Sequence, residues 1–173
     1  CAGQPRDKGE RAQSQPTVHV AQAFSLLYSL MDDEADLDGI LLIKSAPEPT
    51  RGLIRDIAMA AEKARDEMDG FAKTQKGLLL KSTGLPMLEE QARDDIARLT
   101  AGELFTARAE FELRLLLTQH EATNYASALA RQLAESDTDE TRQAFYSRLA
   151  GQFFQLRNQV RTRMATMNAK PNE

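Results

Sequence analysis

Two histidines, His19 and His120, are the residues of this chain best suited to metal chemistry. A carboxylate-bridged di-iron site in a helical bundle needs Glu-x-x-His on two helices, because a spacing of three places both ligands on one inward face. Leu117 precedes His120 by three residues, and Pro16 precedes His19 by three. Neither histidine therefore lies in this motif.

Glu121 and Glu62 are the remaining ligand candidates for His120. Glu121 is adjacent in the chain, and adjacent residues on a helix point in different directions. We therefore predict that His120 lies at the surface or rim of its helix, and that the chain has no metal site and no cofactor.

An acidic run is the second candidate for metal chemistry, and it comprises Asp32, Asp33, Glu34, Asp36 and Asp38. If Glu34 is taken as the first position of a calcium-binding loop, Gly39 falls at the required sixth position. Position twelve is then Ser45 rather than the bidentate Glu that such loops use. We interpret the run as a solvated acidic face or a helix N-terminus.

Nothing in the chain indicates hydrolytic or phosphate chemistry. There is no Gly-x-Ser-x-Gly elbow for a nucleophile and no Gly-rich phosphate loop, so we predict that the protein is not an enzyme. An arginine group, Arg157, Arg161 and Arg163, is interpreted as the polar face of a terminal helix. Contact with an anionic lipid or a partner's acidic patch is the alternative for these arginines.

The only cysteine is Cys1, which is followed by Ala2 and a polar segment ending at Pro16. This start resembles mature bacterial lipoproteins, in which cleavage occurs just before a cysteine that then receives lipid. Several acyl chains on one residue hold a protein to a bilayer permanently, whereas one chain does so only marginally. The resemblance implies a covalent lipid on Cys1, and Ala2 in place of Asp implies the periplasmic face of the outer membrane. An ordinary thiol is the alternative.

Composition indicates one domain behind a tether. Residues 1–16 have few apolar side chains and are predicted to be an extended, lipidated tether. Residues 17–168 are long enough for a substantial core, and residues 169–173 are predicted to fray. With 28% charged residues and a net charge of -4, the chain lacks the basic character of a nucleic-acid-binding protein. We predict no nucleic-acid partner.

Apolar spacings of three and four predict helices throughout. The first segment begins after Pro16, ends by Ala46 and forms one helix or two short ones. The second helix is capped by Thr50 and fades near residues 77–82, and its apolar stripe consists of Leu53, Ile54, Ile57, Ala61, Ala64, Met68 and Phe71. A turn at residues 82–86 precedes a third helix. The first apolar residues of this helix are Met87, Leu88, Ala92, Ile96 and Leu99. From Glu103 to Ala134 there is no Gly or Pro, which predicts a rod of about 45 Å that begins at a capping box near Gly102.

The last helix has the most regular apolar stripe, formed by Phe145, Leu149, Phe153, Leu156, Val160, Met164 and Met167. Asp137 and Glu140 predict a capping box at its start. No strand-like alternation occurs anywhere in the sequence. The predicted fold class is therefore all-α, an antiparallel four-helix bundle with an extended N-terminal tether.

Residues 31–168 resemble the ferritin-like four-helix bundles of exported bacterial proteins, a family of unknown function often labelled predicted outer membrane protein. The likeness is strongest over residues 83–145. It comprises the Gly-Leu-Pro turn, a short helix ending at Leu99, an aromatic at Phe105 or Phe111, His120 in a long helix, and Asp-x-Glu before the last helix. That family commonly has a second histidine on its second helix, where this chain has residues 61–65 without one.

Two functions follow as expectations. The first is a membrane-anchored lipoprotein that acts as a non-enzymatic accessory or scaffold subunit and docks on a protein of the cell envelope. The alternative is a ferritin-like protein that binds a metal or small ligand in a stress or storage role. The sequence leaves open the partner, the oligomeric state, and whether His120 or the acidic run binds a metal.

Overall fold

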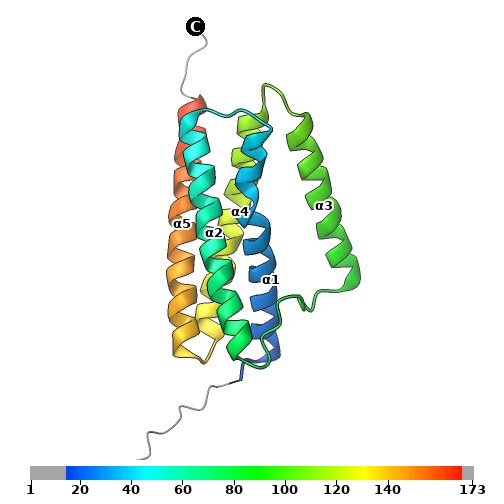
Figure 1. Cartoon of the computed structure of the whole chain (residues 1–173), viewed down its shortest axis with the longest axis vertical. Helices are drawn as coiled ribbons and strands as arrows, with labels where there is room; N and C mark the ends of the chain where they lie inside the picture. Colours follow the sequence, from blue (N-terminus) through cyan, green and yellow to red (C-terminus); the bar gives the residue numbers. More distant parts are fainter. Residues whose placement is uncertain (1–14, 169–173) are drawn as a thin grey trace, which may run out of the picture.

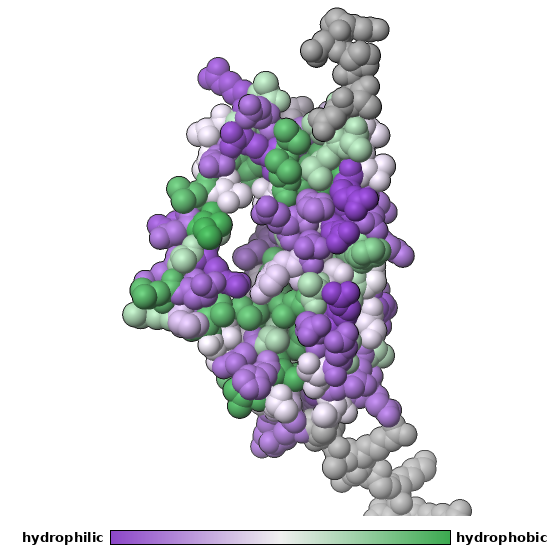
Figure 2. Space-filling view, turned by 180° about the vertical axis from the view of Figure 1, so that it is seen from behind, coloured by the Kyte–Doolittle hydropathy of each residue, from purple (hydrophilic) through white to green (hydrophobic). Residues whose placement is uncertain are grey.

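The computed structural model describes residues 15–168, which form five α-helices and one short 3-10 helix. The α-helices are α1 (Val18–Ala35), α2 (Glu48–Thr74), α3 (Met87–Thr106), α4 (Phe111–Ser136) and α5 (Glu140–Asn168), and the 3-10 helix is η1 (Leu37–Leu42). Helices α1, α2, α4 and α5 pack as a four-helix bundle, whereas α3 stands beside it (Figure 1, Figure 2).

The bundle is antiparallel between neighbours. Around it, α1 lies beside α2, α2 beside α5, α5 beside α4, and α4 beside α1, and each pair runs in opposite directions (Figure 1). Since α2 and α4 run the same way, residues 75–110 must return the chain along the length of the bundle. Helix α3 makes this return. The predicted all-α, antiparallel four-helix bundle is confirmed.

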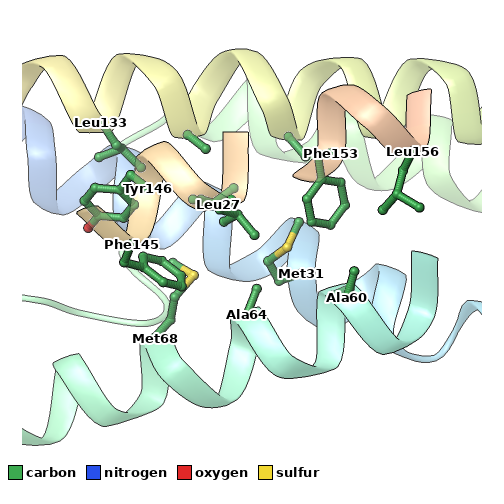
Figure 3. Close-up of a cluster of buried hydrophobic side chains, with 14 of the residues drawn as sticks. Leu27, Met31, Ala60, Ala64, Met68, Leu133, Phe145, Tyr146, Phe153 and Leu156 are labelled. Atoms are coloured by element: carbon green, nitrogen blue, oxygen red, sulfur yellow. The ribbon is translucent and has the colours of Figure 1, made fainter. Parts of the chain in front are cut away.

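The core consists of the apolar stripes of the four bundle helices (Figure 3). Its buried side chains include Phe24, Leu27 and Met31 of α1, Ile57, Ala61, Ala64 and Met68 of α2, Leu116, Ala126, Ala130 and Leu133 of α4, and Phe145, Tyr146, Leu149, Phe153 and Val160 of α5. The ring centroid of Phe145 lies 5.4 Å from that of Phe71 and 5.3 Å from that of Tyr146. The stripes predicted for the second and last helices are therefore correctly placed.

A smaller apolar cluster closes the end of the bundle where α2 and α4 begin. It contains Ala46, Ile54, Leu104, Phe111 and Leu115. Leu104 is the buried hydrophobic residue of α3, so this cluster attaches the end of α3 to the bundle.

The predicted rod from Glu103 to Ala134 is wrong at its start. Helix α3 continues through Gly102 to Thr106, and α4 begins only at Phe111. Residues 107–110 have no Gly or Pro, so nothing in the local sequence marks this turn. The turn is instead set by tertiary contacts: Leu104 and Phe111 pack into one cluster, and Lys44 Nζ donates to the carbonyl oxygen of Ala107 at 3.0 Å.

Two of the predicted caps are also wrong. Thr50 is inside α2, which begins at Glu48 with Pro47 as its N-cap. Pro49 lies in the first turn of α2, where a proline fits because its fixed φ is already helical and the missing N–H has no partner there. Asp139 rather than Asp137 caps α5, since the N–H of Arg142 donates to Asp139 Oδ1 at 3.0 Å.

No helix within residues 15–168 combines the length and the hydropathy that crossing a bilayer would need.

Candidate interaction surface on α3

Helix α3 is unlike the bundle helices because almost all of its side chains are exposed. Its apolar residues recur at spacings of four, four and three: Leu88, Ala92, Ile96 and Leu99, which we call the α3 stripe. The exposed fractions of Leu88, Ile96 and Leu99 are 73%, 63% and 67%. The prediction that these residues form a helix is correct, but the stripe makes no contribution to the core.

The α3 stripe lies on the side of the helix away from Leu104. At 3.6 residues per turn, Leu88, Ala92 and Leu99 lie about 120–160° around the axis from Leu104 and Ile96 lies about 80° from it, so the centre of the stripe is more than a quarter of a turn from Leu104. Figure 2 shows a hollow between α3 and the body of the bundle, with hydrophobic atoms along the protruding helix. The stripe is therefore open to a partner.

Three further contacts restrain α3 against the rest of the chain. Arg114 Nη1 donates to Glu103 Oε2 at 2.9 Å, and Thr83 donates to Glu90. The guanidinium of Arg93 lies 5.8 Å from the ring centroid of Tyr125. Most of these groups are exposed, and such pairs stabilise weakly. Polar contacts and one buried leucine thus position α3.

The acidic run does not form one site. Asp32 accepts from Arg65 Nη1 at 3.2 Å, whereas Glu34 points into the bundle and is buried. Burial raises the pKa of Asp33, and the charges of Asp32, Asp94 and Asp36 raise it further. Asp94 belongs to α3. The carboxylate of Asp33 on α1 therefore faces a carboxylate of α3.

Glu34 is the most perturbed carboxyl group of the bundle interior. Burial raises its pKa to about 7, hydrogen bonding with Gln119 lowers it, and the charge of Asp33 raises it. Glu34 Oε2 and Gln119 Oε1 are both buried without a hydrogen-bond partner. The raised pKa means that the folded protein is more stable when Glu34 is protonated than when it is ionised.

His120 lies on α4 with its side chain partly exposed. Within residues 15–168, no three or more His, Cys, Asp or Glu side chains come together in a way that could hold a metal ion. Cys1 lies outside the described residues.

A buried ion pair at the other end of the bundle escaped the sequence analysis. Arg142 is fully buried, and it donates to Asp137 through Nη2 at 2.5 Å and through Nε at 2.6 Å. Arg142 also donates to Gln75, whose amide donates to Asp139 at 3.3 Å. This cluster joins the end of α2 to the α4–α5 corner, which is a structural role.

The predicted arginine face divides into two environments. Arg163 Nη2 donates to Glu112 Oε1 at 2.6 Å, and its Nε donates to Thr50 Oγ1 at 2.9 Å. Arg157 donates to Asn124 at 2.8 Å and lies 5.0 Å from the ring centroid of Phe154. Arg163 thus ties α5 to α2 and α4, and only part of the group matches the predicted solvated face.

No protein-family model matches the sequence, and a search of curated proteins gave no match. Among solved structures, the chain is similar to the crystal structure of a DUF305 fragment from Deinococcus radiodurans. The TM-score is 0.67 at 19% sequence identity, and the alignment covers 91% of this chain and 100% of that one. At this identity the likeness shows the helical fold alone.

Proposed function

We propose that this protein is a non-enzymatic accessory protein of the bacterial cell envelope, anchored by lipid on Cys1, that docks a protein partner through α3. The observation that carries the docking part is the exposure of the α3 stripe on a helix that stands off its own bundle. Contiguous exposed apolar side chains of this kind mark interaction surfaces.

The spacing of the α3 stripe suits a helix that lies in a groove of its partner. Such complexes use apolar anchors at intervals of three and four residues. Full burial of each large side chain, such as Leu88, Ile96 or Leu99, contributes about 1.5–3 kcal/mol. Three anchors thus contribute about 4.5–9 kcal/mol of gross burial, and association costs a comparable amount, so the complex also needs the polar contacts around the stripe.

The charges around the stripe further define the partner. Helix α3 contains five carboxylates, Glu89, Glu90, Asp94, Asp95 and Glu103, and two arginines, Arg93 and Arg98. Both arginines already pair with carboxylates of the same helix, Arg93 with Glu89 and Arg98 with Asp95. The partner's groove is therefore expected to be apolar with a basic rim, because complementary charge speeds association and fixes register.

Site-specific photocrosslinking in the native host tests the docking. A photoreactive amino acid at Leu99 is expected to give one discrete crosslinked protein. Met59 on α2 is a matched control, because it is apolar and 58% exposed. Recovery of the same species from Met59, or none from Leu99, contradicts the proposal. Mass spectrometry of Cys1 from the same cells tests the anchor, and an unmodified terminus contradicts it.

The alternative is a ferritin-like protein that binds a metal or small ligand. It is supported by the single long crossover from α2 to α4, which is the connectivity of ferritin-like bundles, and by the buried polar groups of Glu34 and Gln119. Titration of the purified protein with iron, zinc and copper distinguishes the two functions. Tight stoichiometric metal would favour the alternative.

A further inference from the structure

Lysines gather at the end of the bundle where α1 begins. Residues 15–168 contain five lysines, and three of them, Lys73, Lys76 and Lys81, are exposed at the end of α2 and in the loop that follows. Between them lies Leu79, which is 57% exposed. We call these four residues the basic end. No ion pair of its lysines is found among the described residues.

The backbone under the basic end is held in place. Ser25 of α1 donates to the carbonyl oxygen of Leu79, and the N–H of Ser82 donates to Ser25 Oγ at 3.4 Å. Gly77, at φ 103°, has a backbone that residues with side chains rarely adopt. Leu79 thus has a fixed main chain and a side chain that points to solvent, although nothing in the fold requires an apolar residue there.

A groove of about 570 Å³ adjoins the lysines. Its apolar lining comes from Ala72 and Leu78–Leu80, and Lys73 and Lys81 are among its polar residues. Its one carboxylate, Asp69, is hydrogen-bonded to the hydroxyl of Tyr28. An apolar floor with cationic edges matches the boundary between acyl chains and phosphate headgroups.

Apart from Asp69 of α2 in the groove, the acidic side chains near this end lie on other elements. Glu135 and Glu140 are exposed at the α4–α5 corner, and Glu89 at the start of α3 pairs with Arg93. The three lysines of the basic end lie on α2 and the loop that follows it. The chain also enters α1 beside this loop, since Pro16 lies against Gly77.

We infer that the basic end docks on an anionic phospholipid surface, with Leu79 inserted among the acyl chains and the three lysines on lipid phosphates. The inference rests on the proposed lipid anchor, which would bring this end of the bundle to a bilayer. The residues before Gln15 span at most about 50 Å when fully extended, so the start of α1 stays within that distance of the membrane. Attraction between the lysines and an anionic surface falls off within about 10 Å, so it orients the bundle once the tether has brought this end to the bilayer.

Chemical tethering tests this docking independently of acylation in the host. Cys1 is the only cysteine, so the full chain can be coupled through its thiol to a maleimide phospholipid in vesicles. The chain has no tryptophan, so Leu79→Trp introduces a single indole fluorophore. Leu42→Trp is the matched control, because Leu42 is 90% exposed at the opposite end of the bundle.

Brominated acyl chains, which quench nearby indoles, report insertion. In phosphatidylcholine vesicles with about 30% phosphatidylglycerol, we expect quenching for Leu79→Trp and none for Leu42→Trp. Replacing Lys73, Lys76 and Lys81 by Gln should weaken docking of the tethered bundle on the vesicle surface. We expect the equilibrium constant for docking to fall about fivefold for each lysine. Vesicles of phosphatidylcholine alone should give little quenching.

Three results would overturn the inference: no quenching of Leu79→Trp, equal quenching at both positions, or equal quenching in neutral and anionic vesicles. Because the maleimide supplies the anchor, these results bear on the basic end alone. An unmodified Cys1 in the native host would instead reject the proposed anchor and leave the vesicle result intact.

Discussion

Helices α5 and α3 have apolar stripes of nearly the same spacing, but the two stripes have opposite environments. In α5, Phe145, Leu149 and Phe153 are buried between α2 and α4. In α3, Leu88, Ile96 and Leu99 are each more than half exposed. The periodicity of apolar residues therefore identifies an apolar face of a helix, but it does not specify which surface covers that face. For α5 the cover is the same chain, and for α3 we propose that it is another protein.

The largest expected difference concerns one apolar side chain from each helix. Phe153→Ala should lower the free energy of unfolding by about 3–5 kcal/mol, because it leaves a cavity in a closed core. Leu99→Ala should change it by less than about 0.5 kcal/mol, because its side chain already contacts water. Urea denaturation measures both. Comparable losses would mean that α3 packs on the bundle in solution.

A second comparison uses acidic partners of arginine. Asp137→Asn should lower the free energy of unfolding by about 3–5 kcal/mol, because it leaves the buried Arg142 without its counter-charge. Asp95→Asn removes the exposed partner of Arg98 on α3 and should cost less than about 1 kcal/mol. Equal effects in urea denaturation would contradict the assigned burial.

Glu34 provides a pH-dependent test of the bundle interior. Its pKa is about 7 in the folded protein against 4.5 as the ordinary value, so the folded state holds the proton more tightly. Stability should therefore fall as pH rises from about 4.5 to 7, by about 3 kcal/mol in total. Glu34→Gln should remove this loss, stabilising the protein above pH 7 and having little effect near pH 4.5.

The matched control for Glu34 is Glu62→Gln, at an exposed position of α2. It should change the free energy of unfolding by less than about 0.5 kcal/mol at any pH. If Glu34→Gln behaves like this control at pH 8, the result contradicts the burial of the Glu34 carboxyl.

The smallest effect is expected from replacing a helical glycine by alanine, at Gly151 of α5 or Gly102 of α3. A Cβ added at either position would meet nothing within 4 Å. Alanine at either position improves helix propensity by up to about 1 kcal/mol. Gly151→Ala should raise the global free energy of unfolding. Gly102→Ala should instead slow hydrogen exchange of α3 amides only, because α3 opens without unfolding the bundle. A global gain from Gly102→Ala would show that α3 folds cooperatively with the bundle.

The sequence predicted the bundle helices well because their apolar residues are covered by one another. The stripes of α2 and α5 were correctly placed, since each depends on local spacing. The turn at residues 107–110 was missed because its residues all favour helix and only distant contacts interrupt it. Likewise, the Arg142–Asp137 pair looks like ordinary surface charge in sequence, and only packing buries it.

For the candidate site, the sequence identified the residues of the α3 stripe as the apolar residues of a helix but did not indicate what covers them. A single-sequence pattern contains no signal that separates an internal from an external partner. The anchor at Cys1 remains a prediction that rests on sequence alone. The basic end was missed because its lysines and Leu79 follow no helical period and meet only in the folded loop.

Covalent labelling of side chains by a photogenerated carbene tests the central claim most directly. In the purified chain, Ile96 and Leu99 should label as readily as Leu42, and Phe153 should be protected. In native membranes, Ile96 and Leu99 should become protected while Leu42 stays labelled. Protection of Ile96 and Leu99 already in the purified monomer, or full labelling in the membrane, would contradict the account.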